Sequence, residues 1–168
     1  MTKTVLVTFA SQTEATAEVA EFIGKTLEEQ GMIVTVKAVD QVTDLNRYQA
    51  LVIGSGVKMD KTYREAQEFL KRSRQSLLQK QFAAFITCGS LSKDTAENRD
   101  KAQKYANQLA EAASARPLSQ GLFAGRMDMS RAKGLIGLLM RKSASKAEDW
   151  RDWDSIRGWA VDLAQQLN

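Results

Sequence analysis

The sequence VLVTFASQTEAT, residues 5–16, combines a strand, a loop and the start of a helix in one short stretch. Its mostly apolar beginning, Val5–Phe9, is typical of a strand buried on both faces of a parallel sheet. Such strands carry ligand-binding loops at their carboxyl ends. Helical spacing then places one set of residues on a common face, namely Thr16, Val19, Ala20, Ile23 and Leu27. We therefore expect a strand, a polar loop over residues 10–15 and an amphipathic helix.

The loop carries three hydroxyl groups that can face one point. Ser11, Thr13 and Thr16 lie at the start of the predicted helix, where backbone N–H groups have no partner within the helix. The partial positive charge of a helix N-terminus, together with three hydroxyl donors, favours a bound phosphate. A simpler interpretation stays open, in which Ser11 or Thr13 caps the helix without any ligand.

Strands and helices alternate along the rest of the chain. Apolar runs predict further strands at residues 33–39, 50–54, 82–87 and 120–124, and amphipathic segments predict the helices. The loop after the third strand is expected at residues 55–60, and Asp152 is a candidate N-cap of the last helix. Five strands in this alternation predict a single α/β domain over residues 1–168, with helices on both faces of a parallel sheet.

An insert after the fifth strand, at about residues 127–150, interrupts this alternation. The formal net charge is +4, and the whole excess falls within residues 126–151. Residues 130–143 show an amphipathic helical pattern with basic edges. This segment packs on the parent domain, or contacts a membrane surface, a quinone or an acidic redox partner. No aromatic residues interleave with the basic ones and no nucleic-acid motif is present, so we expect no nucleic-acid partner.

The composition excludes several kinds of site. The chain has no histidine and one cysteine, Cys88, so it has no internal disulfide, no Ser-His-Asp triad and no typical His/Cys metal centre. Redox or group-transfer chemistry would therefore need a bound cofactor. No apolar stretch approaches the ~20 residues that span a bilayer, and no signal-peptide pattern opens the chain. We expect a cytoplasmic protein.

With these features in hand, the sequence resembles the flavodoxin family over nearly its whole length. In that family the first loop follows the pattern Thr/Ser-x-Thr-Gly-x-Thr/Ser and holds the phosphate of flavin mononucleotide (FMN). The matching residues here are Ser11, Gln12, Thr13, Glu14, Ala15 and Thr16. Glu14 replaces the family's glycine, which matters if its carboxylate faces the phosphate or if φ must be positive. The resemblance implies a flavodoxin-like, doubly wound, five-stranded parallel sheet of order 2-1-3-4-5.

The resemblance also implies two loops around the isoalloxazine ring of FMN. The loop after the third strand corresponds to Ser55, Gly56, Val57, Lys58 and Met59, and the loop after the fourth to Thr87, Cys88, Gly89, Ser90 and Leu91. Met59 stands where tyrosine or tryptophan is common, so a thioether would replace aromatic stacking. Lys58 would either favour the reduced, anionic ring or be an ordinary solvated lysine. A lone Cys88 at a strand end is more typical of a small buried apolar residue than of a redox thiol.

The insert, with the segment Glu148–Trp153, resembles that of the flavodoxin-like proteins that include menaquinone-dependent protoporphyrinogen oxidase. That resemblance implies a quinone- or porphyrinogen-linked reaction and a position of the insert beside the flavin. The chain departs from that group in having no histidine and fewer aromatic residues in the insert.

Two hypotheses follow from the sequence. In the first, the chain is an FMN-dependent redox protein without a catalytic side chain, exchanging electrons or hydride with a partner protein or a small molecule. In the second, it is a flavodoxin-like domain whose flavin site is degraded and which serves as a binding or scaffold module. Glu14 and Met59 favour the second. A phosphoacceptor receiver domain fits less well, because the first strand lacks the acidic pair that would hold Mg²⁺.

Overall fold

A central parallel sheet positions every element of the chain. The computed structural model describes residues 2–127 and 148–168. Its sheet has the order β2-β1-β3-β5-β6, built from β1 (Thr4–Ala10), β2 (Ile33–Ala38), β3 (Ala50–Lys58), β5 (Gln81–Cys88) and β6 (Gln120–Ala124). All four pairings between these strands are parallel. The predicted α/β fold and strand order are confirmed.

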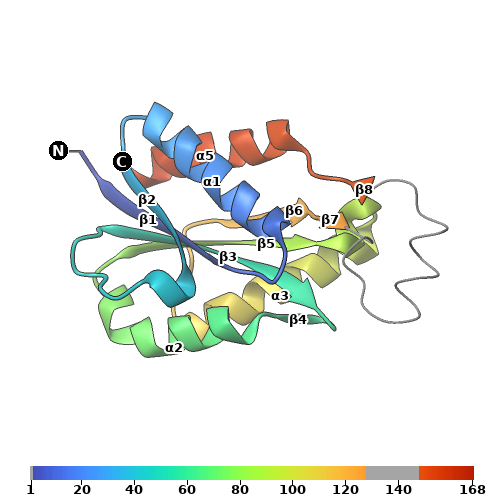
Figure 1. The fold of residues 1–168 in the computed structure, drawn as a ribbon, viewed down its shortest axis with the longest axis horizontal. Coiled ribbons are helices and arrows are strands. Elements are labelled where there is room, and N and C mark those ends of the chain that lie inside the picture. Colours follow the sequence, from blue (N-terminus) through green and yellow to red (C-terminus); the bar gives the residue numbers. More distant parts are fainter. Residues whose placement is uncertain (1, 128–147) are drawn as a thin grey trace.

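In the described part of the chain, four helices cover the two faces of the sheet (Figure 1). On one face lie α1 (Glu14–Glu29) and α5 (Trp153–Leu167), and on the other lie α2 (Arg64–Leu77) and α3 (Ala96–Ala113). Short 3₁₀ turns follow two strands, η1 at Val39–Gln41 and η2 at Gly89–Ser92. Asp152 caps α5 as predicted, since its carboxylate accepts a hydrogen bond from the backbone N–H of Ser155 at 3.1 Å.

The alternating side chains of the strands build two apolar cores. In β1, Leu6 and Ala10 belong to the core under α2 and α3, whereas Val5 and Val7 belong to the core under α1 and α5. The three central strands, β1, β3 and β5, are buried along nearly their whole length. This two-sided burial accounts for the apolar runs in the sequence, because a sheet covered on both faces offers no solvent-facing positions.

The loop expected at residues 55–60 proves to be a β-hairpin instead. Strand β3 continues to Lys58, and the chain turns at Met59 and Asp60 to form β4 (Lys61–Thr62), which pairs antiparallel with β3. Both turn residues have positive φ, 51° and 60°, as two-residue hairpin turns require. The prediction missed this turn because Met-Asp lacks the Asn-Gly or Asp-Gly signature of such turns.

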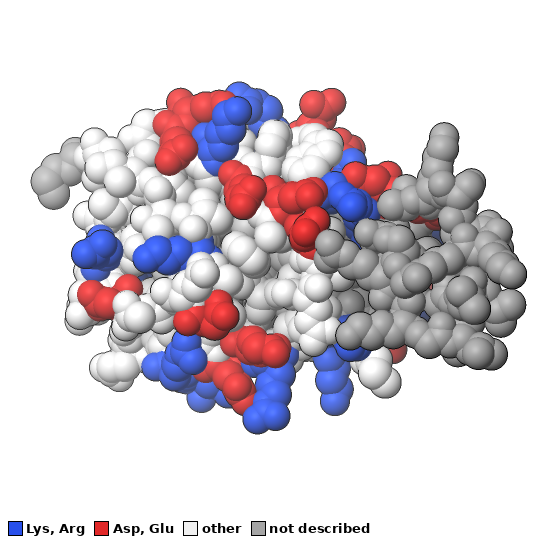
Figure 2. Space-filling model, viewed as in Figure 1, with Lys and Arg blue, Asp and Glu red and all other residues white. Residues whose placement is uncertain are grey.

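The two ends of the insert are joined by a second small sheet. β7 (Arg126–Met127) pairs antiparallel with β8 (Glu148–Asp149). The basic amphipathic segment at residues 130–143 lies outside the described residues. On the face drawn in Figure 2, acidic and basic side chains are interspersed over the described part. None of the described helices has the length and apolar character needed to cross a membrane.

Candidate functional site

A cavity of about 180 Å³ opens at the carboxyl edge of the sheet, where the loops after β1, β3, β5 and β6 meet. Most of its wall is made of hydroxyl-bearing, small or apolar side chains. The residues that line it are Ser11, Thr13, Ala15, Thr16, Gly56, Val57, Tyr63, Thr87, Cys88, Gly89, Gly125, Arg126 and Trp150. Nine of these belong to the predicted cofactor residues, so the structure brings most of the predicted residues to one cavity.

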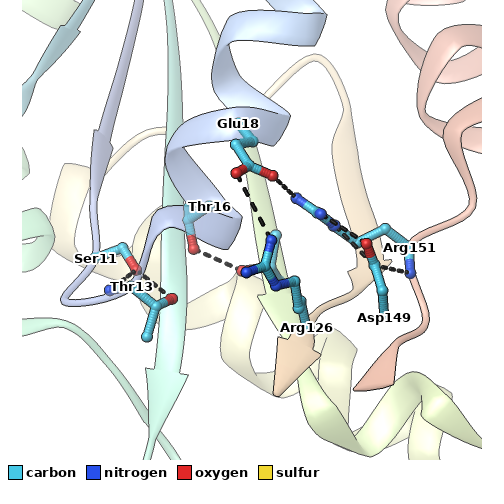
Figure 3. Close-up of polar contacts among 8 residues, drawn as sticks. Ser11, Thr13, Thr16, Glu18, Arg126, Asp149 and Arg151 are labelled. Carbon is cyan, nitrogen blue, oxygen red and sulfur yellow. Dashed lines mark hydrogen bonds and ion pairs between the residues drawn. The ribbon is translucent and has the colours of Figure 1, made fainter. Parts of the chain in front are cut away.

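The start of α1 faces this cavity and lacks a cap from its own N-cap residue. Thr13 occupies the N-cap position in an extended conformation, yet its side chain makes no capping hydrogen bond. Instead the Ser11 hydroxyl lies 3.2 Å from the Thr13 hydroxyl and accepts a hydrogen bond from the Thr13 backbone N–H (Figure 3). By contrast, Thr95 caps α3 by accepting from Asn98 N–H at 3.1 Å. The simple capping interpretation therefore does not describe α1.

Two buried threonines form the floor of the cavity. The hydroxyls of Thr16 and Thr87 lie 2.7 Å apart, and both side chains are at most 5% exposed. Gly56 adjoins them so closely that an added Cβ would lie 3.3 Å from Thr16 Oγ1 and 2.7 Å from the Tyr63 ring. A side chain at position 56 would overlap the Tyr63 ring, so glycine lets Tyr63 and Thr16 pack closely against β3.

Glu14 neither faces the cavity nor needs a positive φ, which were the two possible objections to a glutamate at this position. It is exposed, is the first residue of α1 and does not line the cavity. Positive φ occurs at Met59, Asp60 and Ser114 among the described non-glycine residues, and Glu14 is not one of them. The loop therefore needs no glycine here, and the acid does not occupy the cavity.

The β3–β4 hairpin contributes less to the cavity than predicted. Gly56 and Val57 line it, but Ser55 is fully buried and its hydroxyl donates to Gly56 O and accepts from Tyr63 N–H. Met59 lies at the hairpin tip, 87% exposed and outside the lining. Lys58 donates to Gln12 Oε1 at 3.3 Å, which links the hairpin to the first loop. Gln12 itself lines a neighbouring hollow of about 220 Å³.

The segment after β5 supplies a neutral wall. Thr87, Cys88 and Gly89 line the cavity, whereas Ser90 does not. Burial raises the pKa of the Cys88 thiol, so this group stays protonated at neutral pH and is a poor nucleophile. An added Cβ at Gly89 would meet no heavy atom within 4 Å, so this side of the cavity is open.

An ion-pair cluster lies beside Arg126, one of the residues that line the cavity (Figure 3). Arg151 is anchored by Glu18 on α1 at 2.5 Å and by Asp149 on β8 at 2.7 Å, and its side chain is 4% exposed. Its guanidinium also stacks over the ring of Trp153 at 4.7 Å. The adjacent Trp150 donates its backbone N–H to Gly125 O at 3.2 Å. These contacts fix the segment that brings Trp150 to the cavity.

The unfolding free energy should change with pH because of the pair between Asp149 and Arg151 in this cluster. Hydrogen bonds from Arg151 hold the pKa of Asp149 below its usual 3.8. A depressed folded-state pKa gives stability that is present above 3.8 and is lost as pH falls through the folded-state value. The Asp149 side chain is 40% exposed, so solvent screening limits the effect to about 1 kcal/mol. Urea unfolding should show Asp149→Asn less stable than the parent protein above pH 3.8 and equal to it well below. An equal deficit at both pH values would contradict this assignment.

Four cavity residues were not among the predicted site residues, namely Tyr63, Gly125, Arg126 and Trp150. Gly125 and Arg126 directly follow β6, and the rule that parallel strands present their loops at one edge could have identified them. Tyr63 reaches the cavity because the hairpin returns the chain toward β1, and Trp150 because β8 pairs with β7. Neither feature is visible in hydrophobic periodicity.

Comparison with known proteins assigns this arrangement to a family. Residues 6–154 match the family model described as a flavodoxin domain. The chain belongs to the flavodoxin domain family. Members of this family bind a flavin, usually FMN. A search of curated proteins found no match.

Solved flavodoxin structures share this fold over the full chain. A flavodoxin from the domain Archaea is 18% identical, with 98% of each chain covered and a TM-score of 0.61. The flavodoxin of Streptococcus pneumoniae is 14% identical, with 97% of this chain and 99% of that chain covered and a TM-score of 0.62. A flavo di-iron protein from Thermotoga maritima is 16% identical, with 100% of this chain but 37% of that chain covered and a TM-score of 0.62. At these identities the likeness establishes the fold.

Proposed function

We propose that this flavodoxin-domain protein binds FMN in the described cavity and serves as an electron carrier. The observation that carries the proposal is the start of α1, which points its first turn at the cavity without a side-chain cap from Thr13. A phosphate dianion suits such a helix start, because backbone N–H groups and the helix dipole both favour negative charge. The hydroxyls of Ser11, Thr13 and Thr16 supply further donors beside it.

The rest of the cavity fits the uncharged parts of the cofactor. Gly89 leaves room for a ligand on one side, and Tyr63 and Trp150 offer aromatic surface. A bound FMN would supply the electron chemistry, while the chain's own residues hold it and exclude water. The protonated Cys88 thiol adds a neutral contact and takes no part in electron transfer. Met59 is exposed at the hairpin tip and is not needed for ring contact in this arrangement.

The finer part of the proposal concerns the electron acceptor. A quinone- or porphyrinogen-linked reaction rests on the resemblance of the insert, whose central residues 128–147 lie outside the described part of the chain. The contact of residues 130–143 with a membrane surface rests on the same segment. A reductant-linked activity screen with quinones and a porphyrinogen tests the reaction. Reduced flavin that is reoxidised by protein acceptors alone would leave the plain carrier function.

Thr13 and Thr95 form a matched pair of variants for testing FMN binding. Both occupy helix N-cap positions, but only Thr95 makes a capping hydrogen bond. Replacing Thr13 with valine should weaken FMN binding by about 1–3 kcal/mol, roughly tenfold to hundredfold in Kd, because a donor to the phosphate is lost. Replacing Thr95 with valine should instead cost about 1 kcal/mol of unfolding free energy and leave FMN affinity unchanged.

The measurement is a titration of flavin fluorescence alongside thermal unfolding of each variant. If Thr13→Val binds FMN as tightly as the parent protein does, Thr13 has no role in phosphate binding. If the parent protein binds no FMN even at high micromolar concentration, the scaffold hypothesis replaces the proposal.

A further inference from the structure

Arg126 brings a full positive charge to a cavity that is otherwise lined by uncharged groups. Among the described residues of the lining it is the one Lys, Arg, Asp or Glu. It lies two residues after the end of β6, at the same edge of the sheet as the hydroxyls of the first loop. Figure 3 shows its side chain rising from β7 toward Glu18. The side chain is 29% exposed, so it is partly withdrawn from solvent.

Two neighbouring carboxylates pair with Arg151, and one of them, Glu18, also lies near Arg126. Glu18 lies 2.5 Å from Arg151 through Oε2, and Asp149 lies 2.7 Å from Arg151. Arg126 is 3.9 Å from Glu18 Oε1, which is too long for a hydrogen bond. Arg151 is therefore the closer cation to Glu18. The guanidinium of Arg126 has five N–H donors in a planar fork that suits phosphate oxygens.

We propose that Arg126 neutralises the phosphate of FMN and makes this site select the phosphorylated flavin over riboflavin. The inference rests on the proposed function, because it concerns the same cavity. Arg126 and the hydroxyls of Ser11, Thr13 and Thr16 line one cavity, so a phosphate at the start of α1 has a cation on its other side. A charge-assisted hydrogen bond to phosphate is stronger than a neutral one, so the phosphate contributes much of the binding free energy.

The test compares FMN and riboflavin binding to the parent protein and to Arg126→Gln. Glutamine keeps a polar side chain but removes the charge. We expect Arg126→Gln to weaken FMN binding about tenfold or more, in line with the loss of one charge-assisted contact, and to change riboflavin binding less than about twofold. Arg157→Gln is the matched control. Arg157 lies on α5 and pairs with Glu29 of α1 at 2.7 Å, and neither residue lines the cavity. It should leave both affinities unchanged.

Two results would overturn the inference. An equal loss of FMN and riboflavin affinity in Arg126→Gln would show that Arg126 maintains the structure of the cavity and does not bind the phosphate. Equal affinities of the parent protein for FMN and riboflavin would show that the phosphate is not recognised at all. Failure of the parent protein to bind either flavin is a different outcome, because it refutes the proposed function first.

Measurements on the flavin-free parent protein keep the inference testable if Arg126→Gln does not fold. FMN affinity should fall with added sodium chloride more steeply than riboflavin affinity, because salt screens the phosphate–guanidinium attraction. Inorganic phosphate should raise the unfolding temperature of the parent protein beyond an ionic-strength-matched chloride control. Phosphate should raise the unfolding temperature of Arg157→Gln by the same amount. The rise should be smaller for Arg126→Lys, because lysine keeps the charge but lacks the planar set of donors of arginine. Identical salt slopes for the two flavins, together with no phosphate effect, would contradict the role of Arg126.

Discussion

Replacing Thr16 with valine should lower both FMN affinity and protein stability. Thr16 is 1% exposed and its hydroxyl lies 2.7 Å from that of Thr87. Valine would leave the Thr87 hydroxyl buried without this partner, which costs about 1–3 kcal/mol of unfolding free energy. The loss of a donor beside the phosphate should raise the Kd for FMN by roughly tenfold to hundredfold. Thermal unfolding and flavin fluorescence titration measure the two effects.

The double variant Thr16→Val/Thr87→Val separates the two roles of this pair. Replacing both hydroxyls with methyl groups of the same shape leaves no stranded partner, so stability should return close to that of the parent protein. FMN affinity should stay low, because the ligand still loses its donors. If the double variant regains FMN affinity along with stability, the hydroxyls serve packing alone.

A methyl group at position 54 should lower the stability of the protein markedly. An added Cβ at Gly54 would lie 2.0 Å from Cζ of Phe85, which is fully buried. Phe85 also contacts the rings of Phe123 and Trp159, so it has little freedom to move away. Gly54→Ala should therefore cost about 1–3 kcal/mol through overpacking. Denaturant unfolding at equilibrium measures this cost.

Gly158→Ala is the matched control for that change. Gly158 lies within α5, is exposed, and its added Cβ would meet no heavy atom within 4 Å. Alanine should stabilise the helix by about 0.5–1 kcal/mol, because glycine is a poor helix former. Gly54→Ala with Phe85→Leu should be less destabilised than the sum of the single changes, because the smaller side chain relieves the overlap. Strict additivity would contradict the contact between Gly54 and Phe85.

The fold could be read from the sequence because each buried strand is an apolar run of limited length. The range of β6, Gln120–Ala124, was predicted to the residue, and the ranges of β1, β2 and β5 to within one or two. The end of β3 was missed by four residues. Ser55, Gly56 and Lys58 look like loop residues, but the parallel partner β5 extends pairing to Gly56 and β4 pairs with Val57 and Lys58.

The candidate site was predictable where it consists of consecutive residues and not where it depends on chain reversal. Thr13, Thr16, Gly56, Thr87 and Gly89 were found because they follow strands directly. Met59 lies away from the cavity because it forms the turn of the β3–β4 hairpin, and this turn was not predicted from the sequence. Trp150 reaches the cavity through the pairing of β8 with β7, and no local pattern encodes this pairing across the insert.

The most direct test of the account is a backbone amide NMR titration of the flavin-free protein with FMN. We expect the largest chemical-shift changes at the amides of Thr13 to Thr16, because the phosphate would accept hydrogen bonds at the start of α1. Riboflavin, which lacks the phosphate, should leave these amides nearly unshifted. Binding of FMN that shifts amides elsewhere and leaves residues 13–16 unchanged would contradict the central claim.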